Sequence, residues 1–245
     1  MSSPLEIIQL SKKYEDKIAV KNISFKVKKN EVIGILGPNG CGKTTTIGMI
    51  LGLLKPSNGK ILINGLEIEK QRVNLLAELN FISPYIELPK KLTVQQNLEV
   101  YGRLYDVKYL KEKINHLSEK LRLGDIINKI TGELSSGQKN RVSLAKSIIN
   151  DPLILLLDEP TASLDPETGD FVRSFLEDYK KENKASILLA SHNMAEVERL
   201  CSSVLMMNKG IIIDYGKPAE LIKKHKRQNM EEVFLKLTRE KYEFK

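Results

Sequence analysis

The chain has 245 residues, of which 41% are hydrophobic and 29% are charged. A chain of this length can bury one or two hydrophobic cores. No apolar run approaches the roughly 20 residues that a helix needs to cross a bilayer, and the N-terminal segment lacks the basic and apolar regions of a secretory signal. We therefore expect a protein that stays in the cytoplasm.

The net charge of +8 and the two cysteines narrow the possible functions further. A basic chain can bind nucleic acid or an anionic membrane surface, but here the positive charge is spread out and is densest at residues 223–227. With 6% aromatic residues and no Trp, little is available for stacking on bases. Cys41 and Cys201 have no metal-ligand spacing, so we expect neither a zinc site nor a disulfide framework, and we expect Cys201 in the core.

The first part of the chain predicts strands around a glycine-rich loop. Three short apolar segments predict strands at Leu5–Leu10, Ile23–Val27 and Val32–Leu36. The loop at residues 37–42 follows the third strand directly. Apolar residues at helical spacing then predict a helix over Thr44–Leu54. The sequence KPSNG at Lys55–Gly59 ends it, and a strand at Lys60–Ile63 follows.

The middle of the chain is expected to be mostly helical, from Leu92 to about Ile149. Thr93 and Gln96 have the spacing of a capping box. Two series of apolar residues then line helix faces, namely Val94, Leu98, Tyr101 and Tyr105, and Leu110, Ile114, Leu117 and Leu121. This pattern predicts a helical insert between two strand-rich halves.

After the insert, strands and helices alternate. The continuous apolar run Leu153–Leu157 is typical of a strand buried on both faces, and Asp165 followed by proline predicts a helix start. A strand at Ser186–Ala190, a helix at Met194–Leu200 and a strand at Ser203–Met207 complete the series. Such alternation predicts a mainly parallel sheet with helices on both faces.

The segment Gly37–Thr44, GPNGCGKT, matches the phosphate-binding loop G-x-x-x-x-G-K-[ST]. Its glycines let backbone N–H groups surround phosphates, and the helix N-terminus adds a positive dipole end. Lys43 is expected to pair with the outer phosphates, and the Thr44 hydroxyl to hold Mg²⁺. A glycine-rich turn with a chance lysine is the alternative, but the preceding strand and following helix favour the loop. By itself the loop does not choose among NTPase families.

The segment Leu155–Pro160, LLLDEP, supplies two carboxylates at the end of an apolar strand, where ligands bind in such sheets. We expect Asp158 to coordinate Mg²⁺, through water, and Glu159 to take a proton from the attacking water. The alternative is a polar strand end that caps the next turn, which is less common for a pair of acids.

Leu134–Gln138, LSSGQ, is similar to the LSGGQ signature of ABC ATPases and lies about twenty residues before the acidic pair, as in that family. By this resemblance, the segment closes over the γ-phosphate of ATP held by the opposite protomer; standing alone, it would read as an ordinary Ser/Gly helix start. Ser163–Asp165 resembles the D-loop, which crosses the dimer interface. His192 resembles the switch histidine that contacts the γ-phosphate, and Tyr14 the aromatic residue that stacks on adenine.

The resemblance extends from Tyr14 to about Gly216 and assigns a set of site residues. It implies catalytic roles for Glu159 and His192, and metal binding by Thr44 and Asp158. The residues implied to contact ATP are Tyr14, Gly37, Pro38, Asn39, Gly40, Cys41, Gly42, Lys43, Thr44, Thr45, Ser135, Ser136, Gly137, Gln138 and Asp165.

Two positions depart from the family. Ser136 replaces the first signature glycine, a mild change because Ser still donates a hydrogen bond. Pro84 aligns with the glutamine that the family usually has just before the helical insert. Proline has no side-chain group to bind Mg²⁺ or orient water, so the usual coupling contact of that glutamine is in question.

The resemblance implies an α/β P-loop NTPase fold with a RecA-like core. It places a mainly parallel sheet beside an N-terminal antiparallel β subdomain and an inserted helical subdomain. The ATPase domain is expected over residues 1–216, with the core and β subdomain at 1–82 and 150–216 and the helical subdomain at 83–149. Residues 217–245 are expected to form a short helical tail.

The function implied is that of an ATP-binding and ATP-hydrolysing subunit of an ABC transporter that uses ATP and Mg²⁺. It would dimerise with itself or a similar ATPase in the ATP-bound state. It would sit on the inner face of the membrane against a separate permease, and the sequence resembles exporter-type members. A non-transport ABC ATPase acting on nucleic acid or ribosomes is the alternative, favoured only by the charge. A GTPase lacks support because no N-K-x-D motif is present.

Cys41 lies inside the phosphate loop beside a predicted helix N-terminus, which favours a thiolate. We therefore expect a bulky thiol reagent to inactivate the protein and ATP to protect it. The alternative is that this cysteine only replaces a small residue at a tolerant position.

Overall fold

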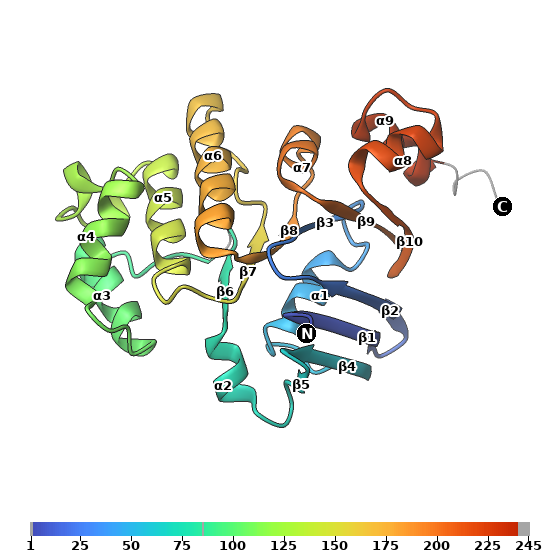
Figure 1. Ribbon diagram of the computed structural model, residues 1–245, viewed down its shortest axis with the longest axis horizontal. Helices are drawn as coiled ribbons and strands as arrows, with labels where there is room; N and C mark the ends of the chain where they lie inside the picture. The colour runs from blue at the N-terminus through green and yellow to red at the C-terminus, as the bar shows by residue number, and fades with distance from the viewer. Residues whose placement is uncertain (1, 85, 240–245) are drawn as a thin grey trace.

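The computed structural model describes residues 2–84 and 86–239, and its centre is a six-stranded sheet (Figure 1). The sheet order is β10-β9-β3-β8-β7-β6, and all neighbouring strands are parallel except β10 and β9. The strands are β3 (Val32–Leu36), β6 (Leu79–Ile82), β7 (Ile154–Asp158), β8 (Ser186–Ala190), β9 (Ser203–Asn208) and β10 (Ile211–Gly216). Every residue of β3, β7, β8 and β9 is buried, as expected for strands covered on both faces.

A second, antiparallel sheet has the order β2-β1-β4-β5. Its strands are β1 (Leu5–Tyr14), β2 (Lys17–Val27), β4 (Asn58–Ile63) and β5 (Leu66–Glu67). Helix α1 (Lys43–Ile50) lies between the two sheets, and its residues Ile47, Met49 and Ile50 share one hydrophobic core with residues of both. The phosphate loop therefore emerges where the two sheets meet.

Helices cover the other face and one end of the central sheet. Helices α3 (Val94–Leu104), α4 (Leu110–Lys120) and α5 (Ser136–Ser147) gather beyond β6, with short 3₁₀ turns at Gly124–Ile126 and Thr131–Glu133 (Figure 1). Helices α6 (Pro166–Asn183) and α7 (Met194–Leu200) share a core with them, as do α8 (Pro218–His225) and α9 (Met230–Arg239). Helix α2 (Arg72–Ala77) precedes β6. None of the helices in the described ranges is long and apolar enough to span a membrane.

The expected fold class is confirmed, because a mainly parallel sheet stands beside an antiparallel N-terminal sheet and a group of helices. The capping box at Thr93 is present, Asp165 caps α6, and Cys201 is buried. The predicted helix Thr44–Leu54 is too long at its C-terminus. It ends at Ile50, because Gly52 takes a positive φ of 66° and turns the chain.

Candidate functional site

The phosphate loop joins β3 to α1 and depends on glycine at three positions. Gly40 and Gly42 have φ values of 76° and 112°, which favour glycine over other residues. A Cβ at Gly42 would also lie 2.7 Å from the carbonyl oxygen of Ala19, and a Cβ at Gly37 would clash with that of Met207. The Lys43 ammonium donates to the carbonyl oxygens of Gly37, at 2.5 Å, and Pro38, at 3.3 Å. Carbonyl groups at the start of the loop thus bind the lysine at its end.

A cavity of about 320 Å³ opens in front of this loop. Residues that line it are Tyr14, Lys17, Ala19, Asn39, Gly40, Gly42, Lys43, Thr44, Thr45, Asp158 and Glu159. Tyr14 is 42% exposed, and the Lys12 ammonium lies 5.0 Å from its ring centroid. The cavity thus joins an exposed aromatic ring to a cationic loop and a pair of acids, which suits a nucleotide with its phosphates.

The two acids at the end of β7 differ in their surroundings. Asp158 is buried, and burial together with the neighbouring Glu159 raises the pKa of its carboxyl, while Lys43 lowers it. Glu159 adopts a left-handed backbone with φ of 51°, a conformation that non-glycine residues keep only when the surroundings enforce it. Its N–H donates to the Ala190 carbonyl oxygen at 2.8 Å. The acidic pair is therefore held against the end of β8.

His192, just after β8, meets Glu159. Its Nδ1 lies 2.7 Å from Oε2 of Glu159, and its backbone N–H donates to the same oxygen at 3.3 Å. The His192 side chain is 74% exposed, whereas that of Glu159 is 17% exposed. The ends of β7 and β8 thus bring the expected base and the expected switch histidine into direct contact.

The signature segment forms the N-terminus of α5. The Ser135 hydroxyl accepts from the Gln138 N–H at 3.3 Å, and Oε1 of Gln138 accepts from the Ser135 N–H at 3.0 Å. Asp165 caps α6 by accepting from the N–H and hydroxyl of Thr168, which hold its pKa below the usual range. A Cβ at Gly137 would lie 3.2 Å from Cγ2 of Thr168. The signature and D-loop segments are therefore neighbours.

The signature segment does not reach the phosphate loop of its own chain. None of Leu134–Gln138 is among the described residues that line the cavity in front of that loop. Figure 1 shows α5 on the side of the sheet away from α1. Ser135 and Ser136 are both exposed. One copy of the chain thus presents the two expected halves of an ATP site on separate surfaces.

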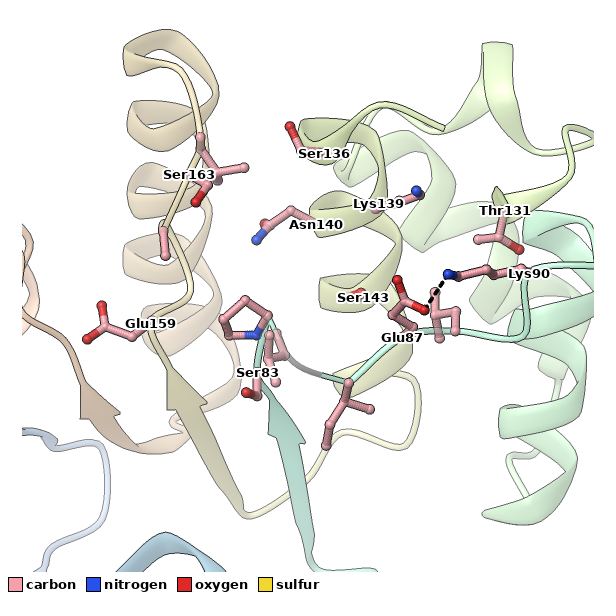
Figure 2. Close-up of a pocket in the computed structure, with 16 residues that line it drawn as sticks. Ser83, Glu87, Lys90, Thr131, Ser136, Lys139, Asn140, Ser143, Glu159 and Ser163 are labelled. Atoms are coloured by element: carbon pink, nitrogen blue, oxygen red, sulfur yellow. Dashed lines mark ion pairs between the residues drawn. The ribbon is translucent and has the colours of Figure 1, made fainter. Parts of the chain in front are cut away.

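A second cavity, of about 280 Å³, separates the end of β6 from α5 (Figure 2). Its lining includes Ser83 and Pro84 from one side and Ser136, Asn140 and Ser143 from α5. In Figure 2 the Asn140 side chain points from α5 toward the strand ends, whereas Ser136 lies at the far end of the helix. Glu159 lines this cavity as well as the one at the phosphate loop, so it lies between them. Pro84, expected from the sequence to stand in place of the glutamine, lines this second cavity.

The expectation of a reactive Cys41 thiolate is wrong. The side chain is buried, and this burial raises the pKa of the thiol despite the opposing effect of Lys43. Its sulfur lies in contact with the position that a Cβ at Gly37 would occupy. Cys41 therefore packs beneath the loop instead of facing the phosphate cavity.

Some contacts at the site were not expected from the sequence. Lys17 and Ala19 of β2 line the phosphate cavity, because β2 passes beside the loop. The Asn140 side chain donates to the Pro160 carbonyl oxygen at 2.7 Å and so joins α5 to the loop after Glu159. No local sequence signal marks these residues, since each acts through a distant part of the chain.

Comparison with known proteins identifies the class. Residues 20–162 match the family described as ABC transporter. The ABC transporter ATP-binding protein NatA of Bacillus subtilis (strain 168) is 35% identical over 238 residues, covering 94% of this chain and 96% of that protein. The Nod factor export ATP-binding protein I of Rhizobium johnstonii is 38% identical over 220 residues, covering 89% of this chain and 70% of that protein.

A solved structure described as an ATP-binding subunit of an ABC transporter superposes with a TM-score of 0.89 at 25% identity, covering 97% of this chain and 100% of that one. The fold and the site define a nucleotide-binding ATPase of the P-loop class. The chain belongs to the ABC transporter family, as an ATP-binding subunit that hydrolyses ATP.

Proposed function

We propose that this chain drives export through a separate membrane-spanning permease, with Glu159 as the base of ATP hydrolysis. The observation that carries the catalytic assignment is the contact between Glu159 and His192 beside the phosphate loop. Adenine stacks on Tyr14, and the outer phosphates pair with Lys43 in place of the carbonyl oxygens of Gly37 and Pro38. Glu159 accepts a proton from the attacking water, and His192 orients Glu159 and contacts the γ-phosphate.

The residues present also fit Mg²⁺. Asp158 and Thr44 offer the hard oxygen donors that this ion prefers. The Asp158 carboxyl is buried beside Glu159 with a raised pKa, so a nearby cation would compensate a charge that Lys43 offsets only in part. When bound, Mg²⁺ would neutralise charge on the phosphates. Thr44 and Asp158 are the residues that would hold it.

We infer that two copies, or this chain and a similar ATPase, share each ATP molecule. The support is the separation of the two halves of the site, since the exposed N-terminus of α5 lies outside the phosphate cavity of its own chain. Residues Ser135–Gln138 of one copy would cover ATP on Gly37–Thr45 of the other, and Asp165 would contact the same interface. Backbone N–H groups at a helix start suit a γ-phosphate.

We propose that the permease docks near the helical insert, beside the second cavity and on the inner face of the membrane. This position is near the catalytic residues because Glu159 lines that cavity, and Ile86, which also lines it, offers exposed apolar area. Val100 and Leu104 of α3 and Tyr109, just before α4, also have exposed apolar side chains on the helical insert. The direction of transport is inferred from the relative named for Nod factor export.

The assignment of Glu159 is tested with two variants that should fail at different steps. Glu159→Gln should bind MgATP with wild-type affinity and lose nearly all hydrolysis, because the amide cannot accept the proton. Lys43→Ala should weaken nucleotide binding itself. Fluorescent-nucleotide titration and phosphate release measure the two steps separately. A wild-type turnover number for Glu159→Gln would overturn the assignment.

A further inference from the structure

Glu196, in the first turn of α7, is a buried carboxyl group that no step proposed above uses. Its exposed fraction is 0%. Oε1 accepts a hydrogen bond from the Thr161 hydroxyl at 3.1 Å, the Ser191 hydroxyl lies near the carboxyl group, and Oε2 is buried. An ionised carboxylate in this setting would be costly, because burial removes its hydration and few donors replace it. The neutral acid suits this environment better.

The pKa of this group agrees with that reading. Burial, the largest effect, and the charge of Glu159 raise it, while hydrogen bonds from the Ser191 and Thr161 hydroxyls and the charge of Arg173 lower it, and the net direction is upward. The hydrogen bond from Thr161 places this carboxyl group against the segment that follows Glu159. Glu196 therefore faces the catalytic loops although its own oxygens do not line the cavity in front of the phosphate loop.

The position of Glu196 links the two loops that carry the catalytic pair. Thr161 is two residues after Glu159, and Glu196 is four residues after His192. Because the Thr161 hydroxyl binds the carboxyl group, the segment after β7 is fastened to the helix that follows β8. The 2.7 Å contact between Glu159 and His192 lies on the same two segments.

The left-handed backbone of Glu159 needs such support. The contacts that hold this turn to other elements include the Glu159 N–H donating to Ala190, the Pro160 carbonyl accepting from Asn140, and the Thr161 side chain donating to Glu196. Only the last of these reaches α7. Losing it would free the turn to move relative to His192, and a displacement of about 1 Å at a reacting group can reduce a rate on the order of 10²-fold.

We propose that Glu196 is a positioning residue that holds Thr161 and thereby sets the geometry of Glu159 against His192. The proposal rests on the assignment of Glu159 as the base. It concerns the rate of the chemical step and not the binding of ATP, because neither Glu196 nor Thr161 lines the phosphate cavity.

The test compares kcat, KM for ATP and Tm in Glu196→Ala, Glu196→Gln, Thr161→Val and Thr161→Ser, each in the full chain. Glu196→Ala and Thr161→Val should lower kcat about tenfold or more while KM changes less than about twofold. Glu196→Gln and Thr161→Ser should restore most of kcat, since the amide oxygen of Gln still accepts from Thr161 and Ser still donates. The double variant Glu196→Ala/Thr161→Val should be no slower than the slower single variant, because both remove one contact.

Glu198→Ala is the matched control. It removes a glutamate from the same helix, where Oε1 of Glu198 accepts from the Met230 N–H at 2.7 Å, and it should lower Tm with no change in kcat. Additive effects of the two single variants, a Glu196→Gln enzyme as slow as Glu196→Ala, or a kcat for Glu196→Ala within twofold of wild type would each overturn the proposal. Glu159→Gln in the same assay separates the assignment of the base from the role of Glu196. If Glu159→Gln hydrolyses ATP normally, the assignment of Glu159 as the base fails. If it is inactive, any of the contrary results above counts against the role of Glu196 alone.

Discussion

The Ser135 hydroxyl has a structural role and a proposed functional one, and Ser135→Ala separates them. In the single chain this hydroxyl caps α5 by accepting from the Gln138 N–H at 3.3 Å. In the proposed dimer the same residue covers ATP bound to the other copy. The substitution should therefore reduce both stability and ATP hydrolysis. Removing the cap of a second helix shows how much of each loss comes from capping alone.

Thr93 provides that comparison, because it caps α3 with the same pair of reciprocal contacts. Its hydroxyl accepts from the Gln96 N–H at 3.1 Å, and Oε1 of Gln96 accepts from the Thr93 N–H at 2.9 Å. Losing either cap should cost about 1 kcal/mol of stability. For a chain of this size, that corresponds to a fall in Tm of about 2–4 °C.

The two variants should differ in turnover. Ser135→Ala should lower ATPase activity about tenfold or more, as expected when a hydrogen bond to a charged phosphate is lost. Thr93→Ala should leave it near the wild-type rate. Calorimetry and phosphate-release assays on both proteins make the comparison. Equal ATPase losses at equal losses of Tm would refute the reasoning, since the signature serine would then act only as a helix cap.

Three further predictions follow from individual side chains. Burial and the raised pKa of Cys41 predict slow labelling by a bulky maleimide at pH 7 and faster labelling as pH rises, measured by mass spectrometry; rapid labelling at pH 7 would contradict this. Glu196→Gln should gain stability over wild type as pH rises above about 4.5, because the unfolded chain then releases a proton that the fold retains, and the gain should vanish at lower pH in denaturant titrations. Tyr14→Ala should weaken ATP binding more than Tyr14→Phe in nucleotide titrations, and equal losses would argue against stacking.

Local patterns in the sequence predicted much of the fold. The bounds of β3, β8 and α7 agree with the predicted segments, because each is a short apolar or periodic run with clear ends. Strand β6 and helix α2 had no assigned prediction, and β1 and β2 are longer than predicted. These elements contain polar residues whose exposure depends on the neighbouring sheet, so their own sequence is a weak signal.

In the candidate site, too, local motifs were predicted and contacts between distant segments were not. Motifs with a fixed spacing led to the phosphate loop, the acidic pair and the cap at Ser135, because each acts through its own backbone segment. Contacts between distant segments gave no such signal, among them the bond between Thr161 and Glu196. Cys41 was misjudged for a related reason: the helix N-terminus nearby favours a thiolate, but packing beneath the loop outweighs it.

A mixture of two inactive variants tests the shared site most directly. Lys43→Ala damages the phosphate loop, and Ser135→Arg damages the signature, so each homodimer has two defective sites. In a heterodimer both defects fall in one site, and the other pairs an intact loop with an intact signature. We predict that ATP favours closure of cross-linked heterodimers over either homodimer. If ATP does not favour closure of the confirmed heterodimers, the shared-site account is contradicted.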